Sequence, residues 1–392
     1  MPEELSTPIY LDHHATTPVD ERVLSAFQPY FTEQFGNPAS VDHSFGAEAK
    51  RGVKRARKQL ANAFGTRPEE FIFTSGATES DNLAIRGAAE YAINQGDGSH
   101  IITTVTEHDA VLEPCEHLED EGFDVTYLPV DEHGRVDVAD VADAIREETI
   151  LVSIMAANNE IGTYAPLAEI GELCKAEEVL FHTDAVQAVG YRELDVDTLG
   201  VDLLSLSGHK IYGPKGIGAL YVRRRRPKVH LKPLLLGGGQ ERGWRSGTLN
   251  VPGIVGLGEA VRLADSEREA RVVHARELTD LLWELLTDEL DNLTRNGHPT
   301  DGLPNNLNVS FGGVENKALV KLLQPEIAVS AGSACTTGSV EASHVLQAIT
   351  DDESRWHSSI RFGIGKDTTE REIQYTAEEV TAAVSRLRKL QF

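Results

Sequence analysis

Three features are scarce in this sequence: cysteines, basic residues and long hydrophobic runs. Only 3 of the 392 residues are cysteines, and an odd number cannot all pair within one chain. This favours reduced thiols over a disulfide framework, and therefore a cytoplasmic location. No apolar run approaches the roughly 20 residues needed to cross a bilayer, and the first residues lack the basic and apolar regions of a signal peptide. We therefore expect no membrane partner.

Basic residues are outnumbered, with 37 Lys and Arg against 62 Asp and Glu, which gives a net charge of −25. Proteins that bind nucleic acid generally present a basic face, so we exclude nucleic acid as a partner. The acidic residues are dispersed along the chain rather than gathered in a tail. We interpret them as an acidic, halophilic-type surface that stays hydrated at high ionic strength, the alternative being an ordinary acidic protein.

From about residue 50 to 225 the chain alternates short apolar runs with amphipathic helical stretches. Continuous apolar strands that alternate with helices are typical of a mostly parallel sheet covered on both faces, and so of an α/β fold. The expected strands are 71–74, 101–105, 149–155, 179–186, 201–207 and 218–224.

The pattern changes after Gly253, where we expect a smaller α+β domain joined through one long charged helical connector. We predict a large domain formed by residues 16–262 and a small domain formed by residues 1–15 and 263–392. The expected elements of the second part are a connector helix over 259–290, strands over 305–313 and 358–365, and a terminal helix over 371–392.

Polar residues collect where the expected strands end, which is where open α/β sheets bind ligands. The first strand is followed by SGATESDN, whose Ser75 and Thr78 could form an anion site at a helix start. His108 follows the next strand, and AANNEIGT supplies Asn158 and Asn159 after a later one. Taken singly, each feature is more often a helix cap, a structural histidine or a loop asparagine.

Two further strand ends favour a functional explanation of the whole set. DAVQ places Asp184 and Gln187 after one apolar strand, and SLSGHK places Ser207, His209 and Lys210 after the next. An acid or a lysine that is buried at the edge of a sheet without a function or a partner lowers the stability of the fold. A lysine whose pKa is lowered there becomes a nucleophile.

The simplest cofactor that uses all of these groups is pyridoxal 5'-phosphate. Lys210 would form the Schiff base, and Asp184 would pair with the protonated pyridine nitrogen to strengthen the electron sink. Gln187 could hydrogen-bond the ring oxygen, and His108 could cover the ring face. The phosphate would be held by SGAT together with Ser207 and His209.

With these motifs the sequence resembles the cysteine desulfurases, which are class V aminotransferase-like enzymes of pyridoxal phosphate fold type I. The resemblance runs from IYLDHHATTPVDERV to SSIRFGIGKDTTEREI, nearly the whole chain, and is strongest with the group I enzymes. Those enzymes supply sulfur to iron–sulfur cluster assembly and tRNA thiolation. The shared motifs are GNPASVDHSFG, FTSGATESDNLAI, TEHDAVL, NNEIG, DAVQAVG, SLSGHKIYGPKGIGALYVRR, GGGQERGWRSGTLNV and GSACTTG.

The resemblance implies roles for the matching residues. Arg361 of SSIRFG would bind the substrate carboxylate, as suits a planar guanidinium, and Asn159 would lie near the substrate. His108 would take part in proton transfers. Thr248 of RSGT would reach the phosphate of the neighbouring subunit in a homodimer. The implied cofactor-binding residues are Lys210, Asp184, Gln187, Ser207, His209, Ala77, Thr78, Asn159 and Thr248.

Cys335 lies in SAGSACTTGSVEAS, a stretch of small residues with little to pack in a core. The resemblance makes Cys335 the third catalytic residue beside Lys210 and His108. Its thiolate would take sulfur from L-cysteine, release L-alanine and carry a persulfide to an acceptor protein. Small flanking residues suit a nucleophile that must reach both the cofactor and the acceptor. The acceptor stays open among an iron–sulfur scaffold, a thiolation enzyme and a molybdenum-cofactor pathway.

Cys115 and Cys174 fall near apolar positions of helical stretches and are expected to pack in the core. A zinc site from His108, Cys115 and His117 would match no standard ligand spacing, so we expect no metal.

Two features depart from the resemblance. The family often has other residues where LDHHATT carries His13 and His14, so no role is assigned to either. The sequence ends with SRLRKLQF, and we expect it to lack the C-terminal extension that helps better-known group I enzymes dock the scaffold protein. Two alternatives stay open: a selenocysteine lyase or another class V lyase or aminotransferase, and a catalytically silent partner in a sulfur-transfer complex.

Overall fold

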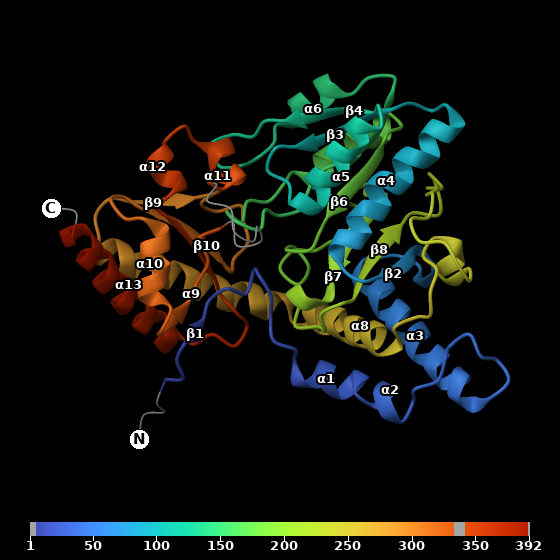
Figure 1. The fold of residues 1–392 in the computed structure, drawn as a ribbon, viewed down its shortest axis with the longest axis horizontal. Helices are drawn as coiled ribbons and strands as arrows, with labels where there is room; N and C mark the ends of the chain where they lie inside the picture. The colour runs from blue at the N-terminus through green and yellow to red at the C-terminus, as the bar shows by residue number, and fades with distance from the viewer. Residues whose placement is uncertain (1–4, 333–341, 391–392) are drawn as a thin grey trace.

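The computed structural model describes residues 5–332 and 342–390, which are organised around a larger, seven-stranded sheet and a smaller, three-stranded sheet, with one further pair of strands (Figure 1). The strands of the larger sheet are β2 (Phe71–Thr74), β3 (His100–Thr104), β4 (Asp124–Leu128), β5 (Thr149–Ser153), β6 (Leu180–Asp184), β7 (Leu203–Ser207) and β8 (Gly218–Val222). They lie in the order β2-β8-β7-β6-β5-β3-β4. Only β8 runs antiparallel to its neighbours, so the predicted mostly parallel sheet is confirmed.

Helices cover both faces of this sheet. Successive side chains of a strand point to opposite sides, and both sides of these strands carry apolar side chains that need to be buried. In β2, Phe71 and Phe73 pack into one hydrophobic core and Ile72 packs into another. Burial on both faces explains why these strands appear as continuous apolar runs. One core includes α1 (Glu21–Phe27), α3 (Ser44–Ala63), α6 (Val138–Ala144), α7 (Leu167–Ala176) and α8 (Val251–Ser266), and the other includes α4 (Ala77–Gln95) and α5 (Asp109–Asp120).

The smaller sheet is antiparallel and lies in the other half of the molecule (Figure 1). Its strands are β9 (Leu293–Asn296), β10 (Asn306–Phe311) and β12 (Ser359–Gly363), in the order β12-β10-β9. They share a third core with α9 (Arg268–Glu289), α10 (Asn316–Leu323) and α13 (Glu370–Leu390). The expected strands over 305–313 and 358–365 and the terminal helix are therefore confirmed.

The remaining elements are short. The N-terminal strand β1 (Ile9–Tyr10) pairs in parallel with β11 (Ile327–Ala328) as a separate two-stranded sheet, and Ile9 and Ile327 pack into the core of the smaller sheet. The division into a domain of residues 16–262 and one of residues 1–15 and 263–392 stays a prediction. The other short elements are α2 (Pro29–Thr32), α11 (His344–Ile349), α12 (Glu353–Trp356), η1 (Pro68–Glu70), η2 (Gly208–Lys210) and η3 (Gln240–Gly243).

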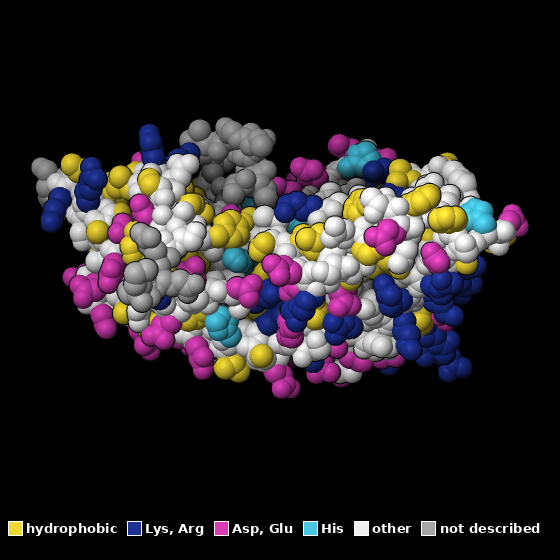
Figure 2. Space-filling view, turned by 90° about the horizontal axis from the view of Figure 1, so that it is seen from below, with side chains coloured by type: hydrophobic (Ala, Val, Ile, Leu, Met, Phe, Trp, Pro, Cys, Tyr) yellow, Lys and Arg dark blue, Asp and Glu magenta, His cyan; other side chains and the backbone are white. Residues whose placement is uncertain are grey.

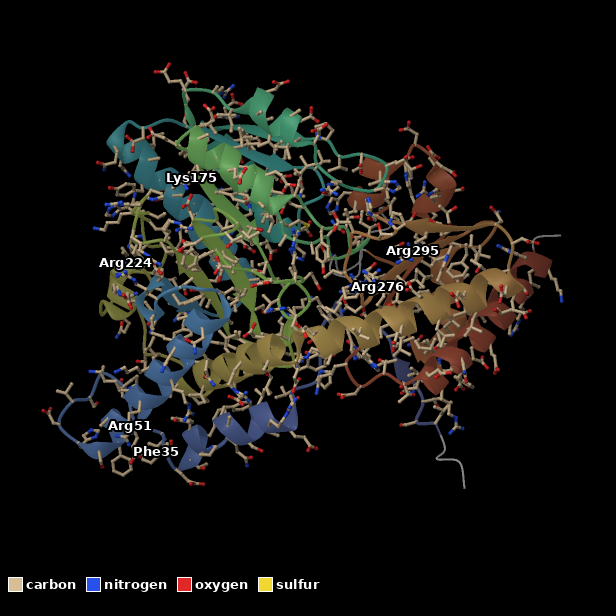
Figure 3. The ribbon with its side chains drawn as sticks, turned by 180° about the vertical axis from the view of Figure 1, so that it is seen from behind. Phe35, Arg51, Lys175, Arg224, Arg276 and Arg295 are labelled. Carbon is tan, nitrogen blue, oxygen red and sulfur yellow. The ribbon has the colours of Figure 1, made fainter. Side chains whose placement is uncertain are left out.

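The expected single connector helix over 259–290 is wrong, because the chain forms two successive helices there. Helix α8 already begins at Val251, where the Asn250 side chain accepts a hydrogen bond from the Gly253 N–H at 3.1 Å. Glu267, with φ −105° and ψ 3°, separates α8 from α9. The buried face of α8 belongs to the larger core and that of α9 to the smaller one. The two helices cross both halves of the molecule along one edge (Figure 3).

The surface is acidic but not uniform. Lys and Arg side chains gather at one end of the molecule, whereas Asp and Glu are spread along the rest of the visible face (Figure 2). That end includes α3, whose sequence carries several basic residues, and Arg51 of this helix lies beside Phe35 there (Figure 3). None of the helices within 5–332 and 342–390 combines the length and apolar character needed to cross a membrane.

Candidate active site

One cavity of about 730 Å³ collects the candidate residues. Every predicted site residue except Cys335 and Thr248 contributes to its lining: Lys210, His108, Asp184, Gln187, Ser207, His209, Ala77, Thr78, Asn159 and Arg361. The segments that follow β2, β3, β5, β6 and β7 supply most of them, as expected for the carboxyl ends of parallel strands. Arg361 comes from β12 of the smaller sheet, so the cavity lies between the two halves.

The anion-binding end of the cavity is the start of α4. Gly76 caps this helix, and a side chain at Gly218 would meet the Gly76 backbone at 2.7 Å, so glycine lets β8 approach the turn closely. The first N–H groups of a helix have no intrahelical acceptor, and its dipole favours negative charge. Ala77 and Thr78 supply two of these groups beside the cavity.

His209 lies near this end and is held by the N-terminal segment. Its Nδ1 is 3.1 Å from the Thr16 hydroxyl, and its carbonyl accepts a hydrogen bond from the Thr17 hydroxyl at 2.9 Å. Burial, assisted by the charges of Lys210 and Lys215, lowers the pKa of His209 to about 4. A neutral His209 can still donate one hydrogen bond to an anion.

Lys210 ends the short helix η2 directly after β7. Gly208 shapes this turn, since its carbonyl accepts hydrogen bonds from the N–H groups of Ile211 at 3.1 Å and Gly213 at 2.9 Å. The Lys210 amine donates to the carbonyl of Ala15 at 2.8 Å and also to that of His14. The N-terminal segment therefore holds the amine inside the cavity through main-chain oxygens.

Asp184 is the last residue of β6 and is 9% exposed. Its Oδ1 accepts a hydrogen bond from the Val186 N–H at 2.8 Å. Burial raises the pKa of Asp184, while this hydrogen bond and the charges of His108 and Lys210 lower it. The carboxylate therefore lies where a buried cationic partner would stabilise its charged form.

Two further carboxyl groups are buried near Asp184. Burial first, and then the charge of Asp184, raises the pKa of Asp81. Burial likewise raises the pKa of Glu107 to about 8, against the hydrogen bonds that its Oε1 accepts from the Met155 N–H at 2.8 Å and the Thr104 hydroxyl at 3.1 Å. Burial therefore favours the neutral form of both acids, and only Asp184 gains from the nearby charges of His108 and Lys210.

Arg361 is 3% exposed and projects from β12. Its Nη2 donates to Asp12 Oδ1 at 2.7 Å, and its Nη1 donates to the carbonyl of Asn159 at 2.8 Å. Asn158, which precedes Asn159 in the sequence, has a different role. Its side-chain oxygen accepts hydrogen bonds from the N–H groups of Glu160 and Ile161 in the same loop. Of the two asparagines, only Asn159 lines the cavity.

Two predicted site residues are not placed in the cavity. Cys335 lies outside the described residues, although Gly332 and Ala342, which flank 333–341, both line the cavity. Thr248 is exposed on the segment after η3 and does not line the cavity of its own chain.

The other two cysteines pack as expected. Cys115 and Cys174 are buried in separate cores, and burial raises the pKa of each thiol to about 12. Within residues 5–332 and 342–390, no group of three or more His, Cys, Asp or Glu side chains is arranged to hold a metal ion.

Sequence reasoning missed several residues that line the cavity. His14 received no role, yet it is 1% exposed and contacts Gln187. Asp81 lies one helical turn after Thr78, a spacing that could have placed it beside the anion site. Glu160 directly follows Asn159, and its carboxylate accepts a hydrogen bond from the Ser343 hydroxyl at 2.5 Å.

The residues present fit pyridoxal phosphate. An amine, a buried acid and a helix start line one cavity, and they match the aldehyde, the pyridine nitrogen and the phosphate of this cofactor. The second oxygen of Asp184, beyond the one bonded to Val186, is the acceptor such a pyridine nitrogen needs.

Comparison with known proteins places this architecture in a family. Residues 9–376 match the family model described as aminotransferase class-V. The cysteine desulfurase IscS of Anaeromyxobacter dehalogenans is 51% identical over 98% of this chain and 95% of its own length. A solved NifS-like protein matches with a TM-score of 0.90 and 38% identity over 97% of this chain and 100% of its own. A structure of SspA in complex with cysteine matches with a TM-score of 0.80 and 38% identity over 92% and 99% of the two chains. The chain belongs to the aminotransferase class-V family.

Proposed function

We propose that this protein is a pyridoxal phosphate-dependent cysteine desulfurase that converts L-cysteine to L-alanine and leaves a persulfide on Cys335. The observation that carries the proposal is the cavity in which Lys210, Asp184 and Arg361 meet. Full-length similarity to a relative named cysteine desulfurase, and the likeness to a protein solved with cysteine, support the substrate.

Arg361 binds the substrate carboxylate in this proposal. Its guanidinium is buried and oriented by Asp12 and Asn159, so little side-chain freedom is lost when a carboxylate arrives. The planar group can form two parallel hydrogen bonds with that carboxylate. The Asn159 carbonyl therefore acts on substrate binding indirectly, by orienting the Arg361 guanidinium.

Lys210 holds the cofactor and moves the proton of the substrate α-carbon. Pyridoxal phosphate, when bound, supplies an electron sink for the charge that develops at this carbon. Asp184 keeps the proton on the pyridine nitrogen, and Ala77, Thr78, Ser207 and His209 bind the phosphate. His108 is half-buried, lines the cavity near Asp184 and serves as a second proton carrier.

Cys335 receives the sulfur. The substrate carbon–sulfur bond breaks, a sulfur–sulfur bond forms at the Cys335 thiolate, and the substrate carbon takes up a proton to become alanine. The overall change, from cysteine and a thiol to alanine and a persulfide, is balanced without an added oxidant. Gly332, three positions before Cys335, lines the cavity, and three residues span at most about 11 Å.

We also propose a homodimer in which Thr248 reaches the phosphate of the partner subunit, and a cytoplasmic sulfur acceptor of the iron–sulfur scaffold or thiolation type. The exposed position of Thr248 leaves it available to another chain. Exposed aromatic side chains at Phe31, Phe35 and Phe45 are the kind of surface that a second copy would cover.

The test compares the wild type with Cys335→Ala and Thr337→Ala, each given L-cysteine, pyridoxal phosphate and a reductant. Alanine and sulfide are measured together with the visible spectrum of the bound cofactor. We expect equimolar products from the wild type and Thr337→Ala, and their loss in Cys335→Ala with the spectrum unchanged. Alanine production that persists in Cys335→Ala would instead indicate a lyase that needs no protein persulfide.

A further inference from the structure

His14 is a buried histidine that the proposed reaction does not use. It lines the cavity, is 1% exposed, and follows Asp12 and His13 in the N-terminal segment. Its ring Nδ1 lies 3.0 Å from Gln187 Oε1, and its main-chain carbonyl accepts a hydrogen bond from Gln187 Nε2 at 3.1 Å. One residue therefore contacts both ends of the Gln187 amide.

These two contacts determine which way the amide faces. The His14 carbonyl can only accept, so the Gln187 NH₂ group must lie on its side. Gln187 Oε1 then faces the imidazole Nδ1, which has to carry a proton. A flipped amide would set its oxygen against the carbonyl oxygen and lose the hydrogen bond to that carbonyl.

A competing acceptor lies at the other ring nitrogen. His14 Nε2 is 3.2 Å from the carbonyl of Asn305, but that carbonyl already accepts the Ile364 N–H at 2.9 Å. Burial, with the nearby charges of Arg361 and Lys210, lowers the pKa of His14 to about 3, so the ring carries a single proton. That proton is best placed on Nδ1, where Gln187 Oε1 needs it.

We propose that His14 is a positioning residue that fixes the Gln187 amide so that its second N–H points to the ring oxygen of the cofactor. The inference rests on the proposed function, because Gln187 was assigned to that oxygen. The neutral imidazole does this without adding a positive charge beside Lys210 and Arg361. It also explains why the chain buries a histidine where aliphatic packing would cost less.

The experiment measures the cofactor dissociation constant and the pH midpoint of its visible absorbance in the purified holoenzyme. His14→Leu removes the ring donor, whereas His14→Asn keeps an N–H near the position of Nδ1. His13→Leu is the matched control, since the His13 ring packs against Tyr10 and Tyr212 instead. The thermal midpoint of each variant reports whether it folds.

For His14→Leu we expect the dissociation constant to rise roughly three- to tenfold, in keeping with one lost hydrogen bond. The pH midpoint should rise as well. A hydrogen bond donated to the ring oxygen lowers the pKa of the neighbouring imine, and this effect is lost when the Gln187 amide is no longer oriented. His14→Asn should restore both values to within about twofold or 0.2 pH units of the wild type, and His13→Leu should leave them unchanged.

A double-mutant comparison separates positioning from packing. In a Gln187→Leu background, His14→Leu should produce no further change in either value, because its effect passes through Gln187. Equal effects of His14→Leu with and without Gln187, or an unchanged pH midpoint in His14→Leu, would overturn the inference. If His14→Leu does not fold, His14→Ser, which is too short to reach Gln187, replaces it.

The outcomes for the two proposals are distinguishable. A wild type that binds no pyridoxal phosphate would overturn the proposed function itself. A wild type with the expected spectrum, but variants that behave alike, would overturn only the role of His14.

Discussion

Arg361 donates a hydrogen bond to the carboxylate of Asp12 at 2.7 Å, across 349 positions of the sequence. The side chain of Arg361 is 4% exposed and that of Asp12 is 19% exposed, so the ion pair is shielded from solvent on the side of the guanidinium. The pair joins β12 to the N-terminal segment, whose Ala15 carbonyl holds the Lys210 amine. Substrate recognition and the reactive amine thus depend on the same short segment.

Replacing Arg361 by Lys should raise the KM for L-cysteine by about tenfold or more and lower kcat less. A lysine offers one point charge and lacks the planar fork with which the guanidinium can make two parallel hydrogen bonds to a carboxylate. Steady-state kinetics of alanine release would measure both constants. Arg355→Lys is the control, because Arg355 donates to Asn296 instead of facing the cavity. An unchanged KM in Arg361→Lys would remove Arg361 from substrate binding.

Glu107→Gln should stabilise the protein at pH 8 but not at pH 5. Burial raises the pKa of Glu107 from 4.5 to about 8, so the folded state keeps a proton that the unfolded state releases. Stability is therefore lost as the pH rises from about 4.5 to about 8, and glutamine removes this loss. We expect a gain on the order of 1–3 kcal/mol at pH 8.

Urea unfolding at the two pH values would measure the gain. Glu147→Gln, at an exposed position, should change stability equally at both. A stability difference between Glu107→Gln and the wild type that does not depend on pH would show that Glu107 is ionised in the folded protein.

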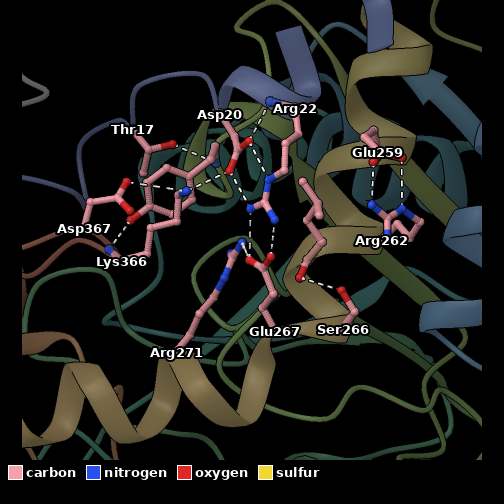
Figure 4. A network of polar contacts seen from close by, with 12 residues as sticks. Thr17, Asp20, Arg22, Glu259, Arg262, Ser266, Glu267, Arg271, Lys366 and Asp367 are labelled. Atoms are coloured by element: carbon pink, nitrogen blue, oxygen red, sulfur yellow. Dashed lines mark hydrogen bonds and ion pairs between the residues drawn. The ribbon is translucent and has the colours of Figure 1, made fainter. Parts of the chain in front are cut away.

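Asp20→Asn should destabilise the protein by roughly 2–4 kcal/mol. The Asp20 side chain is 4% exposed, and it accepts hydrogen bonds from Arg22 and from Lys366 at 2.7 Å. Arg22 also binds Glu267, which separates α8 from α9 (Figure 4). The network therefore ties the N-terminal segment to the junction between the two halves.

The hydrogen bonds from Arg22, more than those from Lys366, hold the pKa of Asp20 well below its usual value. This stability is present at neutral pH and is lost as the pH falls below the pKa of an unfolded aspartate. Asp265→Asn breaks a more exposed pair with Arg268 and should cost less than about 1 kcal/mol. Equal losses in the two variants, measured by thermal or urea unfolding, would argue against a special role for the Asp20 network.

Molar salt should raise the thermal midpoint and the solubility of the protein. The net charge of −25 makes the folded surface repel itself, and screening shortens the range of that repulsion from about 10 Å at 0.1 M to about 3 Å at 1 M salt. Melting curves in KCl from about 0.1 M to about 2 M would measure the effect. A midpoint that stays constant or falls over this range would contradict a halophilic-type surface.

The sequence by itself determined the larger sheet and most of the cavity. The strands are buried on both faces, so they appear as continuous apolar runs, and parallel strands bring their carboxyl ends to one edge. Local motifs such as SGAT, DAVQ and SGHK therefore converge without further information. The two structural cysteines could be recognised for the same reason, because their positions follow the apolar pattern of their helices.

Only the tertiary structure decided how the N-terminal segment takes part. His14 approaches Gln187 and Asp12 approaches Arg361 over 173 and 349 positions, and nothing periodic in the sequence links such distant residues. The break at Glu267 was also hidden, because the residues on both sides of it have helical patterns. The pKa shifts of Asp81 and Glu107 arise from burial among neighbours that the chain brings together only when it folds.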